Sequence, residues 1–173
     1  DRSRGLGDVY KRQMQRVFLR ADCPLKYSEG FNPHAIISIL LPLSVGVGSV
    51  CELMDFQLRE DVDLAALPER LTAVMPEGIR ALEAYPAGRK VRELKWLRVT
   101  GRYEYDHAEP AEMAQKLSAF YARDAIVITR KTKRGEGQMD IVPAIAELHI
   151  RPEDTCVTVE AVISAQEPTL NPD

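Results

Sequence analysis

The sequence predicts an α+β protein built from two tandem halves of similar layout. Three observations lead to this prediction. An apolar stripe with helical spacing ends at a proline, two strand candidates joined by a glycine-rich turn follow it, and the elements after residue 95 come in a similar order to those before. The similarity is one of element order, and no sequence repeat accompanies it.

The composition is that of a globular protein and excludes some classes of function. The chain has 173 residues, of which 45% are hydrophobic and 28% are charged, which is enough to bury a core. The net charge of −3 provides no bulk attraction to nucleic acid or anionic membranes. No apolar run approaches the roughly 20 residues that span a bilayer, and no secretory signal opens the chain.

The three cysteines, Cys23, Cys51 and Cys156, are widely spaced and form no C-x-x-C pair. An odd number without such a pair is typical of reduced thiols in the cytoplasm and not of a disulfide framework. The sequence therefore predicts a cytoplasmic protein, with no membrane partner and no metal bound by these thiols.

The two ends of the sequence indicate a fragment. Residues 1–13, DRSRGLGDVYKRQ, are polar and lack an initiator Met. They resemble a translated sequencing adapter, so we expect an artefactual or disordered tail outside the fold. At the other end, Asn171 or Asp173 suits a helix cap and Pro172 suits a first helical turn. We expect the helix that would follow, and a last strand, to be missing.

The first expected element is the back half of an amphipathic helix in residues 14–23. Its apolar face is formed by Met14, Val17, Phe18 and Ala21. The proline that follows ends it.

A hairpin is expected next. Turn-forming residues occupy positions 28–33, and residues 36–43, IISILLPL, are typical of a strand that is apolar on both faces and therefore central or covered. A Gly-Val-Gly turn at 44–49 connects it to a second strand at 50–58, whose alternation is imperfect.

A helix and a short strand complete the first half. Residues 63–75 are expected to form a helix capped by Asp63, with a stripe of leucines inside, and residues 79–85 to form a strand. The order helix, strand, strand, helix, strand lacks only an opening strand to complete β-α-β-β-α-β, the ferredoxin-like unit.

The second half repeats this layout. A linker at 87–95 separates the first half, residues 14–86, from the second, residues 96–173. The expected elements of the second half are a strand at 96–105, a helix at 110–122 with Met113, Leu117, Phe120 and Tyr121 inward, a strand at 126–129, a basic loop at 130–138, an extra strand or turn at 140–150, and a strand at 156–164. The predicted fold is thus two tandem ferredoxin-like halves, with the first strand and the last helix and strand missing.

A set of residues around the first hairpin resembles the pattern of a known family. The set consists of Tyr27, Ser28, Gly30, Phe31, Asn32, Pro33, His34, Ser38, Pro42, Leu43, Gly46, Ser49, Glu52 and Asp55. The pattern is similar to that of the radical-SAM-linked domain family, a bacterial domain of otherwise unknown function. Residues 131–141 and 170–173 resemble later signatures of the same family. Ala35 departs from the pattern, because the family usually has a proline there.

The resemblance implies a partner protein. Members of this family occur fused to, or encoded beside, radical S-adenosylmethionine proteins. The partner is therefore expected to carry the iron–sulfur cluster and S-adenosylmethionine, since this chain has no three-cysteine cluster motif. No cofactor is expected in this chain. The family's N-terminal strand, and the Ser-His-Leu-Asp that opens its first helix, have no counterpart in the sequence.

His34, beside the turn residues Asn32 and Pro33, is the candidate catalytic residue. Imidazole can ligate a metal, act as a general acid or base, or hydrogen-bond the backbone of a turn, and these alternatives stay open. No histidine at metal-ligand spacing accompanies it, so no metal site is predicted. Glu52 and Asp55 lie three apart on a strand and are expected to face opposite sides, so they form no carboxylate pair unless a bulge intervenes. The alternative is that both are solvated edge residues.

A cationic run provides the candidate phosphate or RNA contacts. Arg130, Lys131, Lys133 and Arg134 lie beside two glycines. Such a loop can contact phosphates, and the alternative is an ordinary solvated surface. A second run of cations at 89–98 surrounds Trp96, which could stack on a base.

Three hypotheses about function follow. The first is an accessory, non-catalytic domain that works with a radical S-adenosylmethionine protein, in substrate presentation. The second is an RNA-binding or RNA-processing domain. The third is an independent enzyme that uses His34 with residues missing from this fragment. The first is preferred, because the sequence contains no self-contained catalytic motif.

Overall fold

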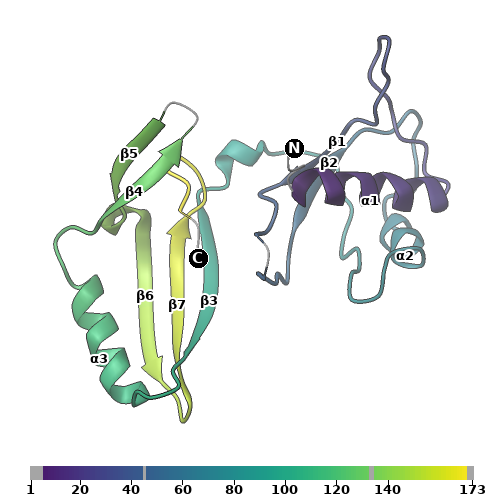
Figure 1. The fold of residues 1–173 in the computed structure, drawn as a ribbon. Coiled ribbons are helices and arrows are strands. Elements are labelled where there is room, and N and C mark those ends of the chain that lie inside the picture. Colours follow the sequence, from purple (N-terminus) through teal and green to yellow (C-terminus); the bar gives the residue numbers. More distant parts are fainter. Residues whose placement is uncertain (1–5, 45, 133–134, 171–173) are drawn as a thin grey trace. The chain divides into compact units, whose positions relative to one another are not determined.

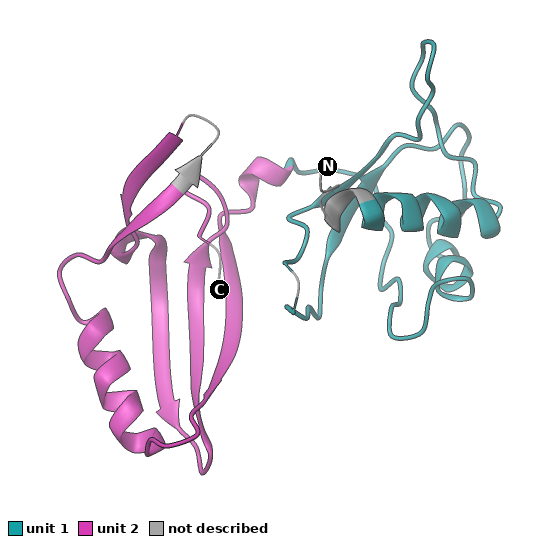
Figure 2. Ribbon diagram, viewed as in Figure 1, with its two compact units in different colours: residues 1–90 teal, residues 91–173 magenta. Residues whose placement is uncertain are grey.

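The computed structural model describes residues 6–44, 46–132 and 135–170. Within these residues the protein is mixed α+β, with three α-helices and seven strands in three small antiparallel sheets (Figure 1). The chain divides into two compact units, unit 1 (residues 1–90) and unit 2 (residues 91–173), which Figure 2 distinguishes by colour. The α+β class predicted from the sequence is confirmed.

The helix α1 (Leu6–Arg20) lies at the centre of the unit 1 core. Phe18 is fully buried, and Met14 packs against the same core. The structure differs here from the expectation that residues 1–13 lie outside the fold, since the described part of that range is helical. Tyr10 continues the stripe of Met14 and Phe18 one turn back, and lengthening an existing helix costs far less than nucleating one.

The C-terminus of α1 is a Schellman motif, so the helix stops at Arg20, short of the predicted end at residue 23. Asp22 has a positive φ of 52°. Its N–H donates to the Leu19 carbonyl (3.2 Å), and the Cys23 N–H donates to the Phe18 carbonyl (2.9 Å). These bonds satisfy helix-end carbonyls that would otherwise have no partner inside the helix.

The predicted hairpin is present. Strands β1 (Ile37–Leu40) and β2 (Leu53–Phe56) form a two-stranded antiparallel sheet in which Ile37 lies opposite Phe56. Both strands are shorter than predicted. β1 ends early because Leu41 has a φ of 50°, in the left-handed region, where an extended strand cannot continue.

The hairpin has one buried face and one open face. Ile37 is buried in the core, whereas its neighbour Ser38 is exposed. The prediction that this strand is covered on both faces is therefore wrong. The reason is that α1 packs against the hairpin from one side, with the Phe18 and Phe56 ring centroids 4.8 Å apart.

The helix α2 (Leu67–Thr72) is shorter than the predicted range of 63–75. Its two leucines are buried in the unit 1 core. Asp63 caps the turn before the helix, because its Oδ1 accepts a hydrogen bond from the Ala65 N–H (2.9 Å). The helix cannot begin earlier, since Pro68 has no N–H to donate to a carbonyl one turn before it.

The prediction of a short strand at residues 79–85 is wrong. No described strand pairs with this segment. Leu82 and Tyr85 are 56% and 59% exposed, and the Ala81 N–H donates to the Thr72 hydroxyl (3.0 Å) instead of to a strand. An extended apolar sequence becomes a strand only where a ladder partner is available.

Unit 2 is built on a three-stranded antiparallel sheet of β3 (Trp96–Glu104), β7 (Cys156–Ser164) and β6 (Ile145–Pro152), in the order β3-β7-β6. The strands predicted at 96–105 and 156–164 are confirmed. Because β3 and β6 flank β7 and both are antiparallel to it, they run parallel to each other. The helix α3 (Pro110–Tyr121) lies between them along the chain.

The predicted helix at 110–122 is confirmed as α3, which packs on β6 and β7 (Figure 1). Of its four predicted inward residues, Met113, Leu117 and Tyr121 are partly buried, and burial raises the pKa of Tyr121. Phe120 is 38% exposed and is not inward. The guanidinium carbon of Arg123 lies 4.7 Å from the centre of its ring, and this cation covers part of the ring.

The prediction of a basic loop at residues 130–138 is wrong. Strands β4 (Val127–Thr132) and β5 (Gly135–Asp140) form a separate two-stranded sheet in which Arg130 lies opposite Gly137. Most residues of the expected loop therefore belong to two paired strands.

Residues 140–150, predicted to be an extra strand or turn, contain both a turn and a strand. A short 3-10 helix, η2 (Val142–Ala144), precedes β6. The Asp140 carboxylate holds the junction, since its Oδ1 accepts hydrogen bonds from the Ile126 N–H (2.9 Å) and the Val142 N–H (3.1 Å).

The range predicted as the linker, residues 87–95, contains a short 3-10 helix, η1 (Val91–Glu93). The side-chain amide of Gln166 donates to the Val91 carbonyl and to the Leu94 carbonyl. These bonds attach the end of the range to unit 2.

Candidate functional site

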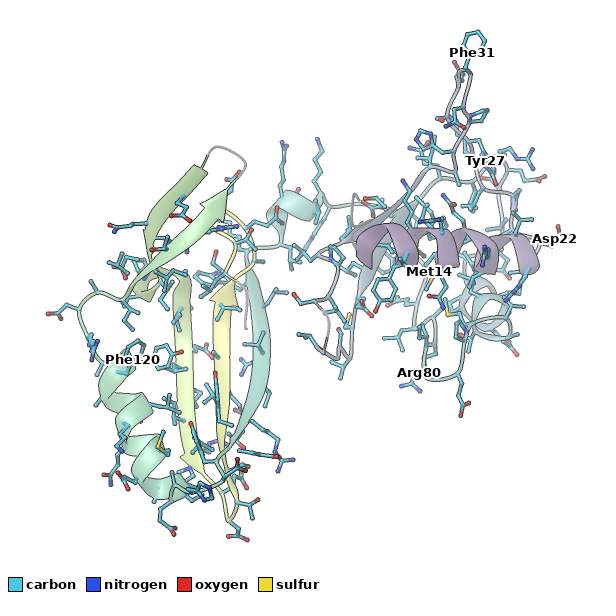
Figure 3. The ribbon with its side chains drawn as sticks, viewed as in Figure 1. Met14, Asp22, Tyr27, Phe31, Arg80 and Phe120 are labelled. Carbon is cyan, nitrogen blue, oxygen red and sulfur yellow. The ribbon has the colours of Figure 1, made fainter. Side chains whose placement is uncertain are left out.

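The residues of the family pattern around the first hairpin gather in unit 1. Most of them lie on the loop of residues 27–35, called here the 27–35 loop, and on the β1–β2 hairpin that follows it. Tyr27 and Ala35 form an antiparallel bridge where the loop begins and ends. In Figure 3, Phe31 stands at the far end of the loop and Tyr27 nearer to α1.

A closed ring of backbone hydrogen bonds holds the base of the 27–35 loop. The Lys26 N–H donates to the Gln57 carbonyl (2.7 Å), and the Gln57 N–H donates to the Ile36 carbonyl (3.0 Å). The Ile36 N–H donates to the Lys26 carbonyl (2.8 Å) and closes the ring. Each of these three residues thus donates once and accepts once. The sequence analysis missed this role of Lys26 and Gln57, because no local pattern indicates which chain segments meet.

Ser28 and His34 close the loop above its base. The Ser28 N–H donates to the His34 carbonyl (2.8 Å), and the His34 N–H donates to the Ser28 hydroxyl oxygen (3.1 Å). The same oxygen lies 2.9 Å from His34 Nδ1. When Nδ1 is unprotonated it accepts a hydrogen bond from the Ser28 hydroxyl, and the proton of the neutral ring is then on Nε2. His34 is exposed, and its Nδ1 also lies 3.5 Å from the Asn32 carbonyl oxygen.

The tip of the loop presents Phe31. Gly30 turns the chain with a φ of 120°, a conformation that side chains rarely adopt. Phe31 is completely exposed, and Asn32 and Pro33 beside it are exposed too. The loop thus combines a fixed base with an apolar side chain that touches no part of the core.

The hairpin places Ser38 and Asp55 directly opposite each other on its exposed face. Glu52 is exposed and precedes β2, so it does not share the strand with Asp55. The structure therefore brings Ser38 to Asp55, but it forms no strand-borne carboxylate pair from Glu52 and Asp55. A general acid and base pair needs two groups that reach one reacting atom.

A hollow of about 390 Å³ lies beside the loop, lined by Tyr27 and by Leu19, Asp22, Cys23, Pro24, Leu25, Arg59 and Glu60. Sequence reasoning did not single out Arg59 or Glu60. They reach this place because the Arg59 N–H donates to the Pro24 carbonyl (2.8 Å), a pairing of distant segments. Cys23 is buried here, and burial raises the pKa of its thiol.

The cationic run is divided between described and undescribed residues. Arg130 is exposed on β4, and its guanidinium donates to the Thr169 carbonyl (3.1 Å). Lys133 and Arg134 lie outside the described residues, and so does the side chain of Lys131. Of the four predicted phosphate contacts, Arg130 is thus the one whose side chain the structure describes, and it lies on a strand and not on a loop.

The second cationic run includes residues of β3. Trp96 is 45% exposed, as a stacking surface requires. Arg98, two residues on, pairs with Glu147 of β6 at 3.4 Å. This ion pair partly neutralises the cation that the sequence analysis placed beside the indole.

The described residues include no group of three or more His, Cys, Asp or Glu side chains that could hold a metal ion. Among the helices of residues 6–44, 46–132 and 135–170, none has the length and apolar character needed to cross a membrane.

The protein is thus α+β, with two compact units, and its sequence motif forms a projecting, exposed loop in unit 1. Comparison of the sequence with protein-family models identifies the family of the chain. The chain belongs to the family described as "Uncharacterized protein conserved in bacteria (DUF2344)", whose model matches residues 9–172. No match was found among curated proteins or among solved structures.

Proposed function

We propose that this chain is an accessory, non-catalytic domain that works with a radical S-adenosylmethionine protein and helps to present its substrate. The observation that supports this proposal is the form of the 27–35 loop. Its motif residues Ser28 and His34 bond to each other, and Phe31 points away from the core. A loop with a fixed base and an open tip suits recognition of another molecule.

The same geometry argues against the 27–35 loop as a catalytic centre. In the described part of the chain, Ser28 and His34 have no third side chain that orients the imidazole, as the acidic residue of a catalytic triad does. The Ser28 oxygen already accepts the His34 N–H. The hypothesis of an independent enzyme would need groups supplied from elsewhere.

The partner is proposed on the family resemblance. It would supply the iron–sulfur cluster and S-adenosylmethionine, and this chain would supply binding surface. The three cysteines are spread over the two units, Cys23 and Cys51 in unit 1 and Cys156 in unit 2, whereas a cluster is typically held by four thiolates.

Co-elution tests the proposal. The chain and the radical S-adenosylmethionine protein encoded beside it are mixed and passed over a size-exclusion column, and the activity of the radical enzyme is measured with and without the chain. We expect a complex and a loss of activity without the chain. Separate elution together with unchanged activity would overturn the proposal.

A second candidate function is RNA binding by the β4–β5 hairpin. The supporting observation is that Arg130 is exposed on β4 opposite Gly137, where nothing lies within 4 Å of the position that a Cβ would take. Fluorescence anisotropy with cellular RNA at two salt concentrations tests this function. Phosphate contacts require binding that weakens with salt and that disappears when Arg130, Lys131, Lys133 and Arg134 are changed to Glu. Binding that survives this change would refute the assignment.

We further propose that the two units are ferredoxin-like halves. In unit 2, β3, α3, β6 and β7 follow one another with β7 between two parallel strands, and this is the split β-α-β arrangement of that fold. The β4–β5 hairpin is then an insertion after the helix. In unit 1, the order α1, β1, β2, α2 is consistent with the same unit without the first and last strands along its chain.

A further inference from the structure

We infer that the 27–35 loop is a protein-docking element that anchors the chain by inserting the ring of Phe31 into an apolar pocket of its partner. The inference rests on the proposed function and specifies the surface and the kind of partner. It draws on three observations: the exposure of Phe31, the hydrogen bonds that fix the loop, and the charges that the loop carries.

Phe31 is the most exposed of the large hydrophobic side chains that the structure describes. Its relative exposure is 112%, against 97% for Val50 and 69% for Leu19. A single exposed apolar residue is ordinary on a protein surface. Phe31 differs because it stands at the end of a projecting loop (Figure 3), where a partner can surround the ring on all sides. Aromatic anchors that enter a pocket are typical of the residues that dominate binding energy.

The loop is held in shape before any partner arrives. The backbone ring through Lys26, Ile36 and Gln57 fixes its base, and the bonds between Ser28 and His34 fix its neck. Binding through this loop therefore loses little conformational freedom beyond that of the tip. Such preorganisation raises affinity by reducing the ordering cost of association.

The charges of the loop favour a protein over a nucleic acid or a membrane. Residues 27–35 contain no Lys or Arg, and their one acidic residue is Glu29 next to the tip. A surface that grips phosphates needs cations, and an anionic membrane would repel Glu29. An apolar pocket with neutral or basic residues at its rim complements both Phe31 and Glu29.

The inference is tested by measuring binding to the radical S-adenosylmethionine protein by isothermal titration calorimetry. The test variant is Phe31→Ser. The matched control is Val50→Ser, which removes the next most exposed large apolar side chain among the described residues, from another loop of the same unit. We expect Phe31→Ser to weaken binding by about 10- to 100-fold, the loss typical of an anchor residue, and Val50→Ser to leave it unchanged. Circular dichroism melts check that both variants are folded.

In-cell photo-crosslinking separates this inference from the proposed function. A photoreactive phenylalanine analogue replaces Phe31, or Phe120 as the control. Crosslinks from position 31 alone to the radical enzyme support both proposals. If the wild-type chain binds the radical enzyme but Phe31→Ser binds equally well and position 31 does not crosslink to it, the inference is overturned and the proposed function stands.

Two further outcomes complete the test. Position 31 can crosslink to a different protein; if that protein, once purified, binds the wild-type chain and not Phe31→Ser, the inference holds while the proposed partner is overturned. Crosslinks from position 31 to RNA or lipid only, or to nothing, overturn the inference whatever the radical enzyme does.

Discussion

Ser28 and His34 are joined by hydrogen bonds of both their backbones and their side chains. The Ser28 hydroxyl oxygen accepts the His34 N–H at 3.1 Å and lies 2.9 Å from His34 Nδ1, while the Ser28 N–H donates to the His34 carbonyl at 2.8 Å. One hydroxyl therefore serves two groups of the residue that closes the loop. The shape of the loop tip depends on this pair.

Ser28→Ala is expected to loosen the neck of the 27–35 loop. The change removes the hydroxyl and both of its bonds to His34, and water replaces them because the site is exposed. We expect a loss of about 1 kcal/mol or less in the free energy of unfolding, and faster hydrogen exchange of the His34 amide. Urea unfolding and exchange measured by NMR check the two effects. Unchanged exchange at His34 would contradict the assigned role, and Ser49→Ala, a change in a different turn of unit 1, is the control.

Asp22→Gly is expected to stabilise unit 1. Asp22 holds a left-handed φ of 52° at the end of α1, and glycine adopts this conformation without the steric cost that other residues have. We expect a gain of about 0.5–1 kcal/mol in the free energy of unfolding, less any loss from the greater freedom of the unfolded chain. Asp22→Val should be destabilising, since a β-branched residue is the least suited to this region. Thermal melts that rank Val above Gly would contradict the motif.

Asp140→Ala is expected to destabilise unit 2 more than Asp140→Asn. The carboxylate oxygen Oδ1 accepts hydrogen bonds from the N–H groups of Ile126 and Val142. Alanine leaves two partly buried donors without this acceptor, and a cost of about 2 kcal/mol follows from about 1 kcal/mol for each bond. Asparagine keeps an oxygen in place. Chemical denaturation of the three proteins tests the order, and equal stabilities for the two variants would be the contrary result.

The three thiols are expected to react at different rates. Cys51 is exposed, whereas Cys23 and Cys156 are buried. Iodoacetamide reacts with an accessible thiolate, so Cys51 should be alkylated at least about tenfold faster than the other two under native conditions. Peptide mass spectrometry over a time course measures the rates. After denaturation all three should react at similar rates, which serves as the control.

The pKa of the Cys23 thiol makes stability depend on alkaline pH. Burial raises this pKa, the nearby Arg70 lowers it to a smaller extent, and Asp22 raises it slightly further. Above the unfolded thiol pKa of about 8.5, the unfolded chain releases the proton while the folded chain keeps it. The contribution is present below that pH and is lost as pH rises through the folded pKa. The free energy of unfolding of the wild type should therefore fall more steeply between about pH 8 and 10 than that of Cys23→Ala. Parallel slopes would contradict the burial of the thiol.

Elements with a strong local pattern could be predicted from the sequence. The strong β-propensity of residues 156–164 and the apolar stripe of residues 110–122 correspond closely to β7 and α3. Residues 79–85 are also predicted to be a strand but form none among the described elements, because strand formation also needs a partner, and a local sequence pattern does not reveal one. The glycines near Arg130 indicated a loop, although the two arms pair as β4 and β5.

For the candidate site, the turn-forming character of the 27–35 loop can be predicted from its residue types. Gly30, Asn32 and Pro33 favour a turn wherever they occur, because their preferences lie in their own backbone. The hydrogen bonds between Ser28 and His34, the closure of the base by Gln57 and the exposure of Phe31 follow only from the folded structure. Whether two segments come into contact depends on how the whole core packs. The conformational preferences of single residues do not contain that information.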